Sequence, residues 1–382
     1  MKTGQCFESR HNDNRFVSSA AFLHNKMKQT KPKLAFERDM SIDKFYNWQK
    51  QVRIKIKELM QFPKTPPQPE PRKLFESKRN GYILQKWELY PEEWSVVPFL
   101  VLIPDTVSES NPGGAVLCFP GSNGTKELLA GEPELSADIP PNAHPEHNKM
   151  ALWYVQEGLI AIAIDNPVTG EVAHNPGQCG AERIAFNYYV LQMGRSYLGI
   201  SVFQKLKVLE WAQKQEFIDQ TRIAVSGHSL GTEPAMIIAN LVPEVSAIIF
   251  NDFLCDFRKM AVASCLTTVA PWHIVPGLLE WFDFPDLLAA CAPRPLIVCE
   301  GGPMVNLRKV QRAYQLMNAE GNFTFHFVPP YDNPSMRRDE IDELPEGLSE
   351  DEYLKHYANV NVKEHYFKRQ FVMPWLKEIW NI

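Results

Sequence analysis

The sequence predicts an α/β protein whose central sheet is mostly parallel and covered by helices on both faces. Short apolar segments that suit buried strands, such as residues 159–165, alternate with segments that suit helices. Between Ile223 and Ala239 the chain passes from an apolar strand through a glycine-rich turn directly into a helix. The composition, with 45% hydrophobic and 22% charged residues in a chain of 382, is that of a soluble globular protein with a substantial core.

The first part of the chain is expected to form an N-terminal helical extension, residues 1–75, to a larger domain, residues 76–382. Residues 1 to about 40 show no clear periodicity. After Ser41, which can cap a helix, apolar residues recur at spacings of three and four: Phe45, Trp48, Val52, Ile56 and Met60. We therefore expect an amphipathic helix before Pro63, followed by a stiff proline-rich linker over residues 63–71.

The larger domain begins with two strand signals that predict an antiparallel pair, with Pro98 suited to an edge position. Strands are expected at residues 81–90, 96–104, 114–119, 159–165, 246–250, 295–299 and 323–328, and a central strand is expected to end at Val225, before the glycine-rich turn. Helices are expected at about 148–157, between about 181 and 215, after the glycine-rich turn, and from about 362 to 379. The long segment 255–292 is expected to place helices over the C-terminal edge of the sheet and to form one wall of a site.

Charge and motif content exclude several classes of function. The net charge of -5 leaves no basic field for nucleic acid, and no apolar stretch reaches the length of a membrane-spanning helix. No signal peptide is evident, so we expect a cytoplasmic protein, with Cys118 and Cys299 as buried free thiols. No nucleotide-binding motif is present, and His144 and His147 have no third ligand nearby, so we expect neither a cofactor nor a metal.

The turn Gly227-His228-Ser229-Leu230-Gly231 matches the pattern G-x-S-x-G. Glycine on both sides of the serine is needed where a tight turn brings the chain against its own neighbours. Such a turn lifts the serine hydroxyl above the sheet, at the positive end of the next helix, where the Leu230 amide can hold an oxyanion. The alternative is a glycine-rich turn without chemistry.

Several segments together resemble the α/β-hydrolase superfamily, over roughly residues 80–382. They are Gly-Arg-Ser-Tyr-Leu-Gly at 194–199, the turn and helix start at 227–234, Asn-Asp-Phe at 251–253, Ala-Pro-Arg-Pro at 292–295 and His-Tyr-Phe-Lys at 365–368. The chain looks most similar to the acetyl-xylan-esterase-like and dienelactone-hydrolase-like branch. This resemblance implies the three-layer α/β-hydrolase fold, a catalytic domain at 76–382, and catalytic residues in the order serine, acid, histidine.

A serine hydroxyl needs a base to remove its proton and donors to hold the oxyanion that forms. His365 fits the histidine position that the resemblance implies, and His356 is the alternative. His326 falls within a strand pattern, where a core role is expected, and His228 is expected to point away from Ser229.

The oxyanion hole is expected to pair the Leu230 amide with an amide from the turn after Phe119. Because Pro120 has no amide hydrogen, the expected partner is Ser122 or Asn123.

The acid is less clearly marked. In the family that the chain resembles, an aspartate usually follows the seventh strand in a pattern like G-x-x-D, but the residues at that spacing here are Met304 and Val305. Asn306 is uncharged, although it could accept a hydrogen bond. Asp252, just past the preceding strand, and Glu300, at the end of the seventh, are the candidates. We rank Asp252 slightly ahead of Glu300, and a dyad or damaged triad is the third possibility.

The sequence thus predicts a cofactor-free serine hydrolase of carboxylic esters, and the resemblance implies acetyl or similar short acyl groups on a carbohydrate such as xylan. Trp272 and Trp281 could stack on a sugar ring or belong to the core. Hydrolysis of a lactone, thioester or peptide by the same residues is an alternative. A second alternative is a degenerate hydrolase that binds a ligand or partner without catalysis. The missing aspartate at Met304 and the presence of Pro120 favour this alternative.

Overall fold

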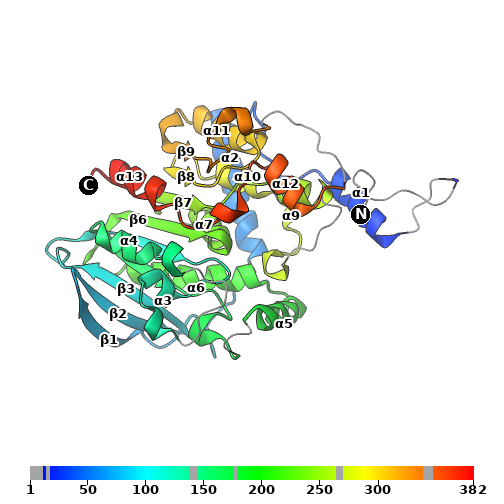
Figure 1. Cartoon of the computed structure of the whole chain (residues 1–382). Coiled ribbons are helices and arrows are strands. Elements are labelled where there is room, and N and C mark those ends of the chain that lie inside the picture. Colours follow the sequence, from blue (N-terminus) through cyan, green and yellow to red (C-terminus); the bar gives the residue numbers. More distant parts are fainter. Residues whose placement is uncertain (1–11, 14–17, 137–144, 176–178, 264–269, 339–346) are drawn as a thin grey trace.

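The computed structural model describes residues 12–13, 18–136, 145–175, 179–263, 270–338 and 347–382, which fold around one central sheet (Figure 1). Within these residues the sheet has nine strands in the order β1-β2-β3-β5-β4-β6-β7-β8-β9. They are β1 (Arg72–Arg79), β2 (Tyr82–Leu89), β3 (Val97–Pro104), β4 (Gly113–Phe119), β5 (Ile160–Ile164), β6 (Ile218–His228), β7 (Ala247–Asn251), β8 (Leu296–Val298) and β9 (Phe323–Phe325). The pairings β1·β2, β2·β3 and β3·β5 are antiparallel, and those from β5 onward to β9 are parallel. The mostly parallel sheet and its antiparallel opening pair are confirmed.

Helices cover both faces of this sheet. In the described residues they are α1 (Ser19–Gln29), α2 (Ile42–Leu59), α3 (Lys126–Ala130), α4 (Met150–Gln156), α5 (Cys179–Gln192), α6 (Tyr197–Ala212), α7 (Thr232–Leu241), α8 (Phe257–Ala263), α9 (Leu278–Trp281), α10 (Phe284–Ala289), α11 (Met304–Leu316), α12 (Glu350–His356) and α13 (Arg369–Trp380). One hydrophobic cluster joins a sheet face to α2, α6, α7, α10 and α11. A second joins the opposite face to α3, α4 and α13. The expected three layers are confirmed.

The continuous apolar strands of the sequence follow from this double covering. Every residue of β4 and β5 is buried. Neighbouring residues of a strand face opposite ways, so Leu117 belongs to one hydrophobic cluster and Cys118 to the other. Cys118 and Cys299 are fully buried free thiols, as expected.

Helix α2 packs its apolar face onto the main core. Ser41 caps it by accepting a hydrogen bond from the Lys44 amide, as the sequence predicts. The apolar stripe is buried in the same cluster as the sheet, and Gln49 donates to the carbonyls of Ala290 and Ala292 at 2.9 and 2.6 Å. The proline-rich residues 63–71 follow without regular structure until β1 begins.

The structure differs from the sequence-based expectations at both ends of the larger domain. Strand β1 was not expected, because charged and mostly exposed residues form it and give no apolar alternation, as is common in edge strands. Strand β3 is not an edge strand, although Pro98 favoured that position: it lies between β2 and β5. The β5 ladder covers only Phe99 to Leu102 of β3, so Pro98 lies beyond its end.

The last helix also begins later than expected. Residues 362–364 form a separate 3-10 turn, α13 starts at Arg369, and His365 lies in the connection between them. Segment 255–292 does contribute helices, α8 to α10, as expected.

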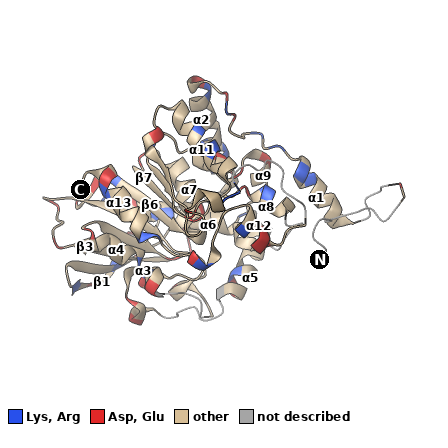
Figure 2. Cartoon of the chain, turned by 45° about the horizontal axis from the view of Figure 1, so that its top comes forward, with Lys and Arg blue, Asp and Glu red and all other residues tan. Residues whose placement is uncertain are grey.

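Acidic and basic residues are interspersed across the elements (Figure 2). Among the described residues, no helix is both long enough and apolar enough to cross a membrane.

Candidate active site

The glycine-rich turn between β6 and α7 holds Ser229 in a strained conformation. Ser229 has a backbone φ of 51°, a left-handed value that residues other than glycine rarely adopt. A Cβ atom on Gly227 would lie 2.2 Å from the Gly231 carbonyl oxygen, and one on Gly231 would lie 2.2 Å from the Phe119 carbonyl oxygen. Both glycines of the motif are therefore sterically required, and the turn packs directly against the end of β4.

His365 lies beside two carboxylates. Its Nδ1 atom is 2.7 Å from Glu300 Oε2 and 3.8 Å from Asp252 Oδ1, so only the contact with Glu300 is within hydrogen-bond distance. Burial alone would lower the pKa of His365, but the charges of Glu300 and Asp252 outweigh it and raise that pKa to about 9. With Nδ1 bound to a carboxylate, Nε2 is the nitrogen left to exchange a proton with a nucleophile.

Glu300 is fully buried and is held by more than His365. Asn251, at the end of β7, donates through Nδ2 to Glu300 Oε1 at 3.1 Å, and the Lys368 ammonium lies 3.6 Å from the same oxygen. Asn251 also donates to the Tyr366 carbonyl at 3.2 Å and accepts from the Lys368 amide at 2.6 Å. One asparagine thus ties the carboxylate to the segment that carries His365.

Asp252 is placed differently. Its burial raises its pKa to about 7, with His365 lowering it and Glu300 raising it. A carboxyl group with that pKa is partly protonated at neutral pH, and it makes a weaker partner for His365 than Glu300 does.

The turn after β4 is fixed by side chains that donate hydrogen bonds to its backbone carbonyls. Asn166 donates through Nδ2 to the carbonyls of Pro120 and Gly121 at 2.9 and 3.3 Å. The Arg183 guanidinium donates to the carbonyl of Ser122 at 2.9 Å. Three consecutive carbonyls are therefore fixed by buried side chains from elsewhere in the chain.

In a planar trans peptide the N–H points opposite to the C=O. The amides of Gly121, Ser122 and Asn123 therefore point away from the side chains that hold those carbonyls. A Cβ atom on Gly121 would lie 3.1 Å from Ser229 Cβ, so this turn abuts the serine. Consecutive backbone amides of a turn can bind an anion, which makes this turn the candidate oxyanion site.

Asn166 is itself positioned by a buried lysine. Lys205 Nζ lies 3.0 Å from Asn166 Oδ1 and 2.8 Å from Ser201 Oγ. Burial lowers the pKa of Lys205 to about 7, and the charge of Asp165 partly opposes that shift. Neither Asn166 nor Lys205 stands in a motif. Asn166 was expected in a turn at the edge of the sheet, where it could touch substrate, and its role in holding the carbonyls was not predicted.

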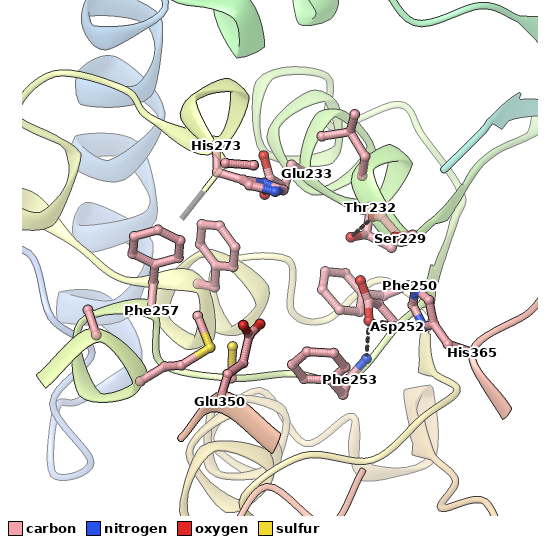
Figure 3. A pocket seen from close by; sticks show the side chains of 16 residues that line it. Ser229, Thr232, Glu233, Phe250, Asp252, Phe253, Phe257, His273, Glu350 and His365 are labelled. Carbon is pink, nitrogen blue, oxygen red and sulfur yellow. Dashed lines mark hydrogen bonds and ion pairs between the residues drawn. The ribbon is translucent and has the colours of Figure 1, made fainter. Parts of the chain in front are cut away.

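The expected catalytic side chains meet at one cavity (Figure 3). It has a volume of about 390 Å³ and is lined by Ser229, Leu230, Asp252 and His365 together with aromatic residues. Ser229 and His365 also line a second, smaller cavity of about 240 Å³ on the side of Ser122 and Asn123. A hydroxyl, an imidazole and backbone amides beside one cavity can carry out acyl transfer.

Comparison with known proteins identifies the family of this chain. Residues 3–378 match the model of the abhydrolase family. The chain belongs to that family. A solved structure from Bacteroides fragilis NCTC 9343, described as a candidate acetyl xylan esterase, is 37% identical to it, with a TM-score of 0.91 over 98% of each chain.

More distant solved structures share the fold of this abhydrolase. A methylesterase is 15% identical, with a TM-score of 0.56 over 96% of this chain and 76% of the other. A glucuronoyl esterase from Teredinibacter turnerae T7901 is 16% identical, with a TM-score of 0.51 over 84% and 90%. No match was found among curated proteins. The α/β-hydrolase fold is thus confirmed, as is its likeness to esterases.

His228 lies next to the candidate catalytic residue His365 of this abhydrolase. Its ring centroid is 4.9 Å from that of His365, and burial keeps its pKa well below the usual value, so the ring is neutral. Among the described residues, His228, Glu300 and His365 form the one cluster whose ligand atoms lie close enough, within 4.8 Å, to hold a metal ion. A cation there would break the His365–Glu300 hydrogen bond and face the Lys368 ammonium, so these residues do not fit a metal.

The other histidines that the sequence singled out do not belong to the described lining of the 390 Å³ cavity. His356 ends α12 at the exposed surface, and the His326 ring stacks on Phe371 with centroids 4.2 Å apart. His144 lies outside the described residues, and the His147 ring packs on Tyr366 with centroids 5.0 Å apart.

The two tryptophans singled out for sugar stacking take different positions in the abhydrolase. The Arg183 guanidinium lies 5.0 Å from the Trp272 ring centroid, beside the cavity wall. Trp281 packs under the ammonium groups of Lys33 and Lys55, at 4.6 and 3.8 Å. Neither ring belongs to the described lining of the 390 Å³ cavity.

Proposed function

We propose that this abhydrolase is a serine-dependent hydrolase of carboxylic esters that removes acetyl or similar short acyl groups from a carbohydrate. The observation that carries the proposal is the strained Ser229 at the same cavity as His365, whose Nδ1 contacts a buried carboxylate. The substrate class is supported by the similarity to the candidate acetyl xylan esterase.

In the first half of the reaction, Ser229 Oγ attacks the ester carbonyl carbon and its proton passes to Nε2 of His365. The amides of Leu230 and of the turn at Ser122 and Asn123 donate to the oxyanion. When the tetrahedral intermediate collapses, the carbon–oxygen bond to the alcohol breaks and His365 returns the proton to the departing oxygen. Water then attacks the acyl-serine by the same route and releases the acid.

Glu300 takes the role of the acid in this proposal, ahead of Asp252, which reverses the order favoured by the sequence. It accepts from His365 Nδ1, fixes the ring and balances the imidazolium charge that develops. Asp252 adds negative charge at 3.8 Å without a direct hydrogen bond.

Acetate release from acetylated xylan and from p-nitrophenyl acetate tests the proposal. Wild-type protein is expected to release acetate and Ser229→Ala to release none above background. If the two proteins behave alike, the proposed function is wrong. A panel that adds a lactone, a thioester and a peptide would show whether another carbonyl compound is the better substrate.

A further inference from the structure

The cavity contains a second histidine–carboxylate pair that the proposed mechanism does not use. Glu233 lies in the first turn of α7, and His273 ends the 3-10 turn Pro271–His273. His273 Nδ1 is 2.5 Å from Glu233 Oε1, and both residues line the cavity with Ser229. Figure 3 shows this pair on the opposite side of the cavity from Asp252 and His365.

The pair offers both an acceptor and a donor. Glu233 is only 5% exposed, and its Oε2 atom has no hydrogen-bond partner among the described residues. Buried carboxylate oxygens normally accept hydrogen bonds, so an orphaned one at a cavity wall is a place for a ligand donor. Since Nδ1 of His273 is bound to Glu233, Nε2 is the ring nitrogen left for a ligand. Burial would lower the pKa of His273, but the charge of Glu233 raises it, which favours a ring with an Nε2–H donor.

Much of the remaining cavity wall is apolar and includes Leu230, Phe250, Phe257, Met260 and Phe284. Thr232, Asp252 and Glu350 are further polar residues in the lining. A mostly apolar cavity with a few fixed polar groups is typical of a site that orients a small ligand. The Glu233–His273 pair supplies polar groups of this kind on the side away from His365.

The pair is also connected, through Arg183, to the turn of Gly121, Ser122 and Asn123 after β4, called the oxyanion turn below. The Arg183 guanidinium donates to the Ser122 carbonyl and lies over the ring of Trp272, which precedes His273 in the same 3-10 turn. A ligand group held by the pair is therefore fixed relative to the reacting carbonyl.

We propose that Glu233 and His273 bind a hydroxyl group of the substrate close to the ester, and so select acyl groups carried by a polyhydroxylated alcohol. The hydroxyl would accept from His273 and donate to Glu233. This inference rests on the proposed esterase function. It names the residues that would determine which alcohol part of the ester is accepted. A site built to hydrogen-bond a hydroxyl discriminates against an analogue that lacks it, because its buried polar groups then stay unpaired.

The test compares two esters in the full-length protein. Glu233→Gln keeps the shape of the side chain, and His273→Gln removes the imidazole. For an acetylated xylo-oligosaccharide, each variant is expected to lower kcat/KM about 10- to 100-fold, chiefly through KM, since the hydroxyl is bound in both ground and transition states. For p-nitrophenyl acetate, which has no hydroxyl, kcat/KM should change less than about threefold.

Matched controls are Glu280→Gln and His174→Gln, exposed residues outside the cavity lining, which should leave both rates unchanged. Thermal unfolding of each variant checks folding, and if Glu233→Gln does not fold, His273→Gln alone decides the question. Equal losses on both esters, or no loss on the sugar ester, would overturn the inference while leaving the esterase function intact. A wild-type protein that hydrolyses neither ester would refute the proposed function and the inference with it.

Discussion

Replacing Glu300 by glutamine tests which carboxylate orients His365. Glu300 Oε2 lies 2.7 Å from His365 Nδ1, whereas Asp252 Oδ1 lies at 3.8 Å, beyond hydrogen-bond distance. Glutamine retains the shape of glutamate but removes the charge that balances the imidazolium. Replacing the acid of a well-studied serine protease by its amide lowers kcat about 10⁴-fold, so we expect a loss of about 10³- to 10⁴-fold here.

The assay is the initial rate of p-nitrophenyl acetate hydrolysis, with Asp252→Asn as the matched variant. Because Asp252 contributes charge without a direct hydrogen bond, its amide variant should lose less than about tenfold. Glu300 is fully buried, so thermal unfolding must show that Glu300→Gln remains folded. A larger loss for Asp252→Asn than for Glu300→Gln would refute the assignment of the acid.

Four further predictions follow from the geometry of the site and from the raised pKa of His365. The neutral form of His365 is the base and its pKa is about 9, so kcat/KM should rise with pH up to about 9; a profile that is flat above pH 7 would contradict this. Because the pKa of His365 is raised in the folded state, its protonation contributes stability that is fully present below about pH 6.5 and is lost as the pH rises through about 9. The melting temperature of wild type should therefore fall more over that interval than the melting temperature of His365→Gln. Asn166→Ala frees two carbonyls of the oxyanion turn and should lower kcat about 10²-fold at nearly constant KM; an unchanged kcat would refute this positioning role. Gly231→Ala places a Cβ atom 2.2 Å from the Phe119 carbonyl oxygen and should cost about 3 kcal/mol or more in urea unfolding, whereas Gly180→Ala, with no atom within 4 Å, should change stability by less than about 1 kcal/mol.

The strands and the serine turn could be predicted from the sequence because their causes are local. Strands buried on both faces are continuous apolar runs in the sequence. The glycine-rich turn requires glycine at fixed positions around Ser229. Strand β1 could not be predicted in this way. Its register is set by pairing with β2, and its side chains are charged and largely exposed.

The surroundings of the candidate site depend on contacts between distant parts of the chain. Glu300 and His365 are brought together only when the end of β8 lies beside the segment before α13, and the sequence, which does not show this contact, favoured Asp252 instead. Asn166 and Arg183 stand outside any recognisable motif, yet they fix the carbonyls of the oxyanion turn. Such roles belong to the folded arrangement and leave no local pattern in the sequence.

The identity of the nucleophile is tested most directly by covalent labelling with a fluorophosphonate probe, followed by mass spectrometry of the labelled peptide. We predict a single strong adduct on Ser229 that is lost in Ser229→Ala and greatly slowed in His365→Ala. An intact, folded protein that takes no label at Ser229, or that labels equally fast without His365, would contradict this prediction.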